Sequence, residues 1–121
     1  NRLTRLPHPT TPITEIKILR AGNANLTIIP VDVIRQLTGL RGLDLLNNRL
    51  TRLPPGMFRS LNGLVALALS FNRLTRLPAE IGSLSQLEWL YLANNLLVSV
   101  PDELRHLTRL QYLDLRGNFI T

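Results

Sequence analysis

Apolar residues recur along this chain at one fixed spacing, and an asparagine occupies the same place in each recurrence. The spacing is L-x-x-L-x-L-x-x-N-x-L, and it occurs four times in succession, beginning at Leu40, Leu64, Leu87 and Leu110, with Ile120 as the last apolar residue of the fourth copy. Neighbouring copies start 24, 23 and 23 residues apart. A fixed period of this length is the signature of a repeated structural unit, so the sequence predicts a stack of similar coils.

The central L-x-L of each copy predicts a short strand. Side chains alternate between the two faces of a strand, so both leucines point to one face and the residue between them points to the other. A single strand cannot bury its leucine face alone. Stacking the copies about 4.8 Å apart pairs each strand with the next in a parallel sheet and joins the leucines into one core.

After Asn48, Asn72 and Asn95, apolar residues follow two and five positions on and are succeeded by a proline. The proline marks the start of the outer segments, such as 78–87 and 101–110. Proline is well tolerated where a helix begins, and acidic residues follow it in both segments. The segments also carry apolar residues at helical spacing, at Ile81, Leu84, Leu104 and Leu107. They predict short helical or 3₁₀ turns on the convex side.

The asparagine column, Asn48, Asn72, Asn95 and Asn118, falls where each chain segment leaves its strand. Backbone N–H and C=O groups lose their sheet partners there, and a buried amide side chain can supply both a donor and an acceptor. In the first copy Ala24 replaces the asparagine, which predicts a looser first turn.

Two frames are possible for the first strand. One keeps the register of the later copies and buries Leu19, with Ile16, Ala21, Ala24 and Leu26 at the other pattern positions. The rival frame uses Ile13, Ile16 and Ile18. We favour the first frame because it aligns Ile13 with Leu37, Leu61, Leu84 and Leu107.

The repeat resembles the leucine-rich-repeat family along the whole chain. The resemblance implies an α/β fold, a right-handed solenoid with a concave parallel sheet and short helical or 3₁₀ convex segments. Residues 1–121 would form a single array of about five coils. Because both ends fall within a repeat and no polar cap is evident, we expect the chain to be part of a longer protein.

In this family the residues between and just after the strand leucines project from the concave face, which usually binds partners. Trp89, Tyr91 and Tyr112 would lie side by side there, and Trp, Tyr and Arg are enriched at binding hot spots. Alternatively, the rings only pack across strands. The predicted protein-binding site comprises these three residues with Glu88, Asp114 and Arg116, together with Asp44 and Leu46 in the same outward columns.

Thirteen of the 14 basic residues are arginines, and the formal net charge is +6. Arg2, Arg49 and Arg73 share one repeat position, and Arg5, Arg52 and Arg76 share another, with Asn25 and Ile28 interrupting the two stripes. Such stripes could contact phosphates of a polyanion. Nucleic acid is nevertheless disfavoured, because the aromatic residues lie in other coils and bases need a stacking surface beside the charge. Phe71, just before an asparagine, is interpreted as a ring that plugs its turn.

Catalytic chemistry has no evident residue set. The chain has no cysteine, His8 and His106 lie in separate segments, and Asp44 and Asp114 lie three coils apart. We expect no enzyme activity, no cofactor and no metal site. The enzymatic alternative is indirect, in which the array is the substrate-recognition or regulatory part of a larger ubiquitin-ligase effector or receptor kinase.

Composition bears on the cellular setting. No signal peptide or membrane-spanning run is evident, and the lack of cysteine favours an intracellular setting. Asn25 begins an N-glycosylation sequon, which matters only in a secreted protein.

Overall fold

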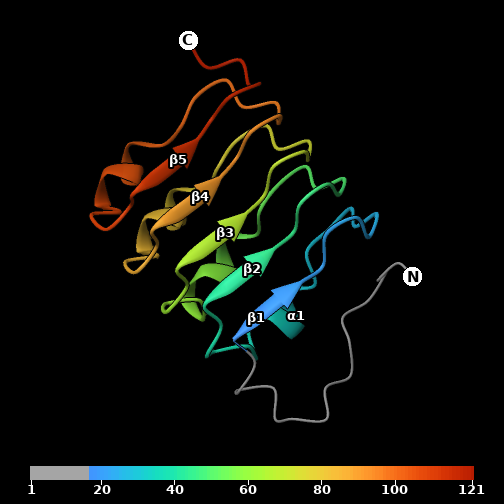
Figure 1. Ribbon diagram of the computed structural model, residues 1–121, viewed down its shortest axis with the longest axis vertical. Coiled ribbons are helices and arrows are strands. Elements are labelled where there is room, and N and C mark those ends of the chain that lie inside the picture. Colours follow the sequence, from blue (N-terminus) through green and yellow to red (C-terminus); the bar gives the residue numbers. More distant parts are fainter. Residues whose placement is uncertain (1–16) are drawn as a thin grey trace.

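A five-stranded parallel sheet forms one face of the protein, with its strands side by side in chain order (Figure 1). The computed structural model describes residues 17–121, so the expectations for Arg2, Arg5, His8, Ile13 and Ile16 lie outside the described residues. The strands are β1 (Ile18–Arg20), β2 (Gly42–Asp44), β3 (Ala66–Ala68), β4 (Trp89–Tyr91) and β5 (Tyr112–Asp114).

The register of the sheet follows the sequence repeat. Leu19, Leu43, Leu67, Leu90 and Leu113 pair in turn across the five strands. The first four are buried, while Leu113 in the last strand is half-buried. In β1 the exposed fraction of Leu19 is 5% and that of Ile18 is 57%, which confirms the in-register frame for the first coil.

Each outer segment begins a short helix directly after its proline. The helices are α1 (Val31–Ile34) and the 3₁₀ helices η2 (Pro55–Arg59), η3 (Ala79–Ser83) and η4 (Asp102–His106), and Pro30, Pro54, Pro78 and Pro101 precede them. The predicted convex turns are therefore confirmed. In the part of the chain from residue 17 onward, none of these helices is long and apolar enough to cross a membrane.

The core lies between the sheet and these helices and consists almost entirely of aliphatic side chains. The 24-residue unit that carries η2 buries two neighbouring residues, Met57 and Phe58, where the 23-residue unit that carries η3 buries Ile81. The extra residue of the longer unit is thus absorbed in its outer turn. The strands of both unit types remain in register.

The asparagine column hydrogen-bonds neighbouring coils to one another. The Nδ2 group of Asn72 donates to the carbonyl oxygens of Leu69 in its own coil and Leu45 in the preceding coil, both at 3.0 Å. Its Oδ1 accepts from the Leu50 N–H at 3.0 Å. The same pattern recurs at Asn48, Asn95 and Asn118.

The first turn lacks its own asparagine, but the asparagine of the second coil forms hydrogen bonds with it. Asn48 accepts from the Ala24 N–H and donates to the Ala21 carbonyl, both at 3.0 Å. The second coil thereby satisfies backbone groups of the first. A looser first turn stays a prediction.

A second column, just before the asparagines, adopts left-handed backbone conformation in every coil. The residues are Asn23, Asn47, Phe71, Asn94 and Gly117, with φ between 57° and 74°. Asparagine and glycine adopt this conformation more readily than other residues, whereas a bulky side chain is an outlier there. Phe71 is therefore the exception in a column that otherwise follows backbone preference.

Candidate functional site

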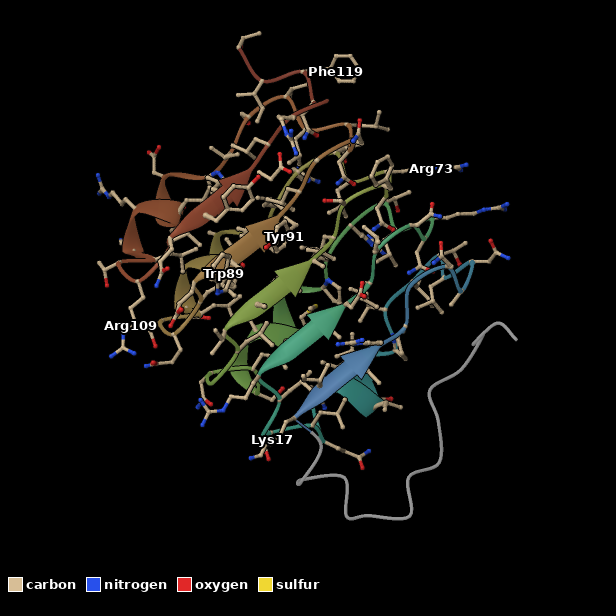
Figure 2. All side chains as sticks on the ribbon, viewed as in Figure 1. Lys17, Arg73, Trp89, Tyr91, Arg109 and Phe119 are labelled. Atoms are coloured by element: carbon tan, nitrogen blue, oxygen red, sulfur yellow. The ribbon has the colours of Figure 1, made fainter. Side chains whose placement is uncertain are left out.

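Three aromatic side chains gather on the sheet face over β4 and β5. Trp89 and Tyr112 are direct partners across these strands, and their exposed fractions are 39% and 41%. Tyr91 is half-buried, and its ring centroid lies 5.4 Å from that of Tyr112 with the ring planes tilted by 49°. Figure 2 shows Trp89 and Tyr91 on this face. We call these three residues the aromatic cluster.

Glu88 flanks the aromatic cluster at the start of β4 and is half-buried. Its Oε1 accepts a hydrogen bond from Gln111 Nε2 at 3.2 Å. The hydrogen bond joins the residues that precede β4 and β5, and Glu88 directly precedes Trp89. Its carboxylate is partly engaged within the chain.

Asp114 and Arg116 form an ion pair beside the aromatic cluster. Arg116 Nε and Nη2 donate to the two carboxylate oxygens of Asp114 at 2.9 and 2.8 Å. The Asp114 side chain is 8% exposed and that of Arg116 is 81% exposed. The hydrogen bond from Arg116 lowers the pKa of Asp114 despite its burial, and Asp114 raises the pKa of Arg116. The guanidinium, rather than the carboxylate, therefore faces solvent.

Asp44 and Leu46 occupy the predicted outward columns but lie apart from the aromatic cluster. Asp44 is in β2, and β3 separates it from β4. Its Oδ1 accepts a hydrogen bond from the Leu46 N–H at 2.9 Å, and both side chains are half-buried. Between the two regions β3 presents only Ala66 and Ala68. The structure therefore brings together six of the eight predicted site residues and leaves these two at a distance.

Phe71 does not plug its turn, so that interpretation is wrong. Its exposed fraction is 54%, because the left-handed backbone at this position turns the side chain away from the core. The sequence carried a signal for this geometry. The corresponding residues of the other coils are Asn23, Asn47, Asn94 and Gly117, which are residue types that favour left-handed conformation.

The two arginine stripes form beyond the carboxyl ends of the strands. The N–H of Arg49 donates to the Leu26 carbonyl, and the N–H of Arg73 donates to the Leu50 carbonyl, so equivalent residues stack from coil to coil. Arg49, Arg52, Arg73 and Arg76 are all exposed, and Figure 2 shows Arg73 extending away from the sheet. We call these four arginines the basic edge. Asn25 and Ile28, which precede them in the first coil, are also exposed.

Residues typical of catalysis or metal binding are scattered over the fold. Asp44 and Asp114 belong to β2 and β5, with two strands between them, and His106 is exposed in η4. Within residues 17–121 no group of three or more His, Asp or Glu side chains could hold a metal ion.

Solved structures with the same architecture include a leucine-rich-repeat protein of Leptospira interrogans, with 38% identity and a TM-score of 0.77. A structure of the BIR3–SERK2 complex of Arabidopsis thaliana matches with 35% identity and a TM-score of 0.74. An internalin of Listeria monocytogenes, at 24% identity and a TM-score of 0.74, shares the fold. These matches cover 88%, 83% and 89% of this chain.

The chain spans only 26%, 55% and 30% of the length of those three proteins. A comparison with curated proteins returned no match. The family model described as "Leucine rich repeat" matches residues 14–74 and 62–120, which together cover nearly all of the sequence. The chain therefore belongs to the leucine-rich-repeat family.

Proposed function

We propose that this chain recognises a partner protein through its concave sheet face, with the aromatic cluster at the centre of contact. Leucine-rich-repeat folds generally mediate protein–protein interaction and are typically binding modules rather than enzymes. The matching Arabidopsis structure is itself a complex of two proteins. The choice of contact residues rests on the geometry of this chain.

The observation that carries the proposal is the exposed apolar area of the aromatic cluster. The sole Trp and both Tyr residues of the chain meet on two neighbouring strands. Trp89 and Tyr112 remain substantially exposed although the leucines beneath them already form the core. Such rings offer large contact area at a small cost in side-chain entropy, which is why Trp and Tyr dominate binding hot spots.

The neighbouring strands leave room for a partner beside the rings. β2 and β3 present Gly42, Ala66 and Ala68 at positions that β4 and β5 fill with aromatic side chains. A partner segment could therefore approach the backbone of β3 while packing one side against Trp89 and Tyr91. The exposed guanidinium of Arg116 supplies a polar contact at the opposite border.

A role as the recognition or regulatory part of a larger enzyme is compatible with the same surface, since such a part must also select a protein partner. That role stays a prediction, as do an intracellular setting and the state of the exposed Asn25 sequon.

The experiment first identifies the partner and then measures the contribution of Trp89. A photo-crosslinking amino acid at Tyr112 should capture the partner, whereas the same group at Arg105 on the convex helix η4 should not. With the captured partner, Trp89→Ala should weaken binding by at least about 2 kcal/mol, with the thermal midpoint nearly unchanged. Ile18→Ala, an exposed residue of the same column in β1, serves as the matched control and should leave affinity unaltered.

A different result would place Trp89 in a structural role. If Trp89→Ala lowered the thermal midpoint strongly and left affinity unaltered, the ring would serve sheet packing alone, and the proposed site would be wrong.

A further inference from the structure

Positive charge is segregated on the basic edge. The segments that lead from each strand to the next proline, 21–29, 45–53, 69–77 and 92–100, contain four arginines and no acidic residue. The described carboxylates lie elsewhere, on the sheet side or in the convex helices. This edge therefore attracts negatively charged ligands without local compensation.

The arginine side chains of this edge have no acidic partner within the described residues. In residues 17–121 the ion pair is that of Arg116 with Asp114, and no side-chain hydrogen bond engages Arg49, Arg52, Arg73 or Arg76. Equivalent arginines lie in neighbouring coils, about 4.8 Å apart at the strand spacing. Each stripe thus presents two adjacent guanidinium groups that retain all their donors.

Two hollows lie along the basic edge, and each is bordered by one arginine from each of the two coils. The larger has a volume of about 500 Å³ and is lined by Arg49, Arg73, the Phe71 ring and several asparagines. The second has a volume of about 410 Å³ and is lined by Arg52, Arg76, Leu53, Leu77 and two prolines. The larger hollow combines two arginines with asparagines and one aromatic residue, and the second combines two arginines with apolar side chains.

Phe71 lines the larger hollow with an aromatic ring, although its backbone conformation is unfavourable for a bulky residue. The fold does not require a ring at this position. Its φ of 60° is a conformation that asparagine or glycine adopts in the other four coils. Because the ring is also 54% exposed, it gains little from burial. Strained residues of this kind concentrate at ligand sites, where the contact with the ligand compensates for the strain.

Apolar side chains continue the same edge into the last coils. Leu96 and Phe119 follow Arg49 and Arg73 at the equivalent repeat position, and their N–H groups donate to the preceding coil in the same way. Leu96, Val98 and Phe119 are all exposed. Figure 2 shows Phe119 near the C-terminus, beyond β5.

We infer that the basic edge is a second binding surface, which takes an acidic segment of a partner protein with an apolar side chain packed on Phe71. Carboxylates of the segment would accept hydrogen bonds from the paired arginines, a fork geometry that guanidinium groups match well. Phe71 does place a ring beside the charge, which removes the sequence-based objection to nucleic acid. The apolar continuation through Leu96 and Val98 favours a peptide, since phosphate contacts gain nothing from aliphatic side chains.

The test uses a fluorescein-labelled peptide, Glu-Glu-Phe-Leu-Glu-Glu, and fluorescence anisotropy. We expect saturable binding with a Kd below about 1 mM. The same peptide with Gln in place of Glu should bind at least about tenfold more weakly, because the charge-assisted hydrogen bonds are lost. An oligothymidylate of equal negative charge should also bind more weakly than the acidic peptide.

Variants localise the site. Arg49→Gln with Arg73→Gln should weaken peptide binding at least about tenfold. The matched control, Arg59→Gln with Arg105→Gln in the exposed parts of η2 and η4, removes equal charge and should have little effect. Trp89→Ala should leave peptide binding unaltered, which separates this surface from the concave one.

Phe71→Asn provides the sharpest variant because it inserts the residue found at this position in three other coils. It should weaken peptide binding about fivefold while leaving the melting temperature unchanged or raised. A lowered melting temperature with unaltered affinity would make Phe71 structural and overturn the inference. So would absence of peptide binding up to about 1 mM, tighter binding of the oligothymidylate, or equal losses in the two double variants.

Discussion

The coils around β2 and β3 and those around β4 and β5 share one buried framework but carry different kinds of residue on their surfaces. On the sheet face the first pair presents small, half-buried residues, such as Gly42 and Ala66, where the second pair exposes Trp89 and Tyr112. On the loop edge the order reverses, since the first pair carries the four arginines and the second carries Leu96, Val98 and Phe119. The aromatic cluster and the basic edge thus belong to different coils.

The difference arises without a change in backbone. Asn48, Asn72 and Asn95 make equivalent hydrogen bonds to the coil before them, and the left-handed position recurs in all five coils. The repeat therefore constrains the buried and turn-forming positions, while exposed positions are free to differ. Two neighbouring regions of one array can consequently serve different contacts.

The largest expected effect tests whether the buried framework is equivalent in both regions. Leu90→Ala in β4 and Leu43→Ala in β2 each remove a buried leucine between two neighbouring strands, so each should cost about 2–5 kcal/mol of unfolding free energy. Urea denaturation of both variants measures the losses. Similar losses of unfolding free energy would show that the buried framework is equivalent in the two regions. A loss confined to one region would show that the two frameworks differ in energy.

A smaller effect is expected from the asparagine column. Asn72→Ala should cost about 1–3 kcal/mol, because the Leu50 N–H and the Leu45 and Leu69 carbonyls lose their buried partner. Thermal and urea unfolding measure the loss. Asn118→Ala is the control, because Asn118 is half-buried and water can reach the backbone groups that lose their partner. Its loss of unfolding free energy should therefore be smaller. Equal losses would contradict the role of burial.

The smallest effect concerns the ion pair beside the aromatic cluster. Because Arg116 lowers the pKa of Asp114 in the folded state, the pair stabilises the fold fully above the unfolded carboxyl pKa, near pH 4, and the stabilisation is lost as pH falls below that value. Thermal midpoints of the wild type and Asp114→Asn should therefore differ above about pH 4 and converge toward about pH 2. A difference that grows on acidification would show that the pKa shift has the opposite sign.

Much of the fold could be predicted because each coil repeats the same requirement. The alignment of Ile13 with Leu37, Leu61, Leu84 and Leu107 selected the correct frame for β1, although the rival frame made a better local strand. Stacking makes every strand depend on its neighbours, so the common register outweighs a local preference. The prolines likewise marked the start of every convex turn.

The candidate site was only partly predictable. Register placed Trp89, Tyr91 and Tyr112 together, but it could not show that Arg116 covers Asp114, since that depends on the conformations of two side chains. Phe71 was misinterpreted because an apolar residue next to the repeated asparagine suggests burial, whereas its positive φ directs the ring outward. The exposed ring adds an aromatic surface beside Arg49 and Arg73, which the sequence did not predict.

The sequence by itself determined which positions are buried and how the coils stack, because periodic burial of leucine and hydrogen bonding by asparagine leave one register that satisfies every unit. Tertiary structure alone decided how the exposed residues combine. Whether a charge is paired, a ring is accessible or a hollow lies between two coils depends on the relative positions of side chains from different repeats. These surfaces, rather than the repeat itself, carry the two binding proposals.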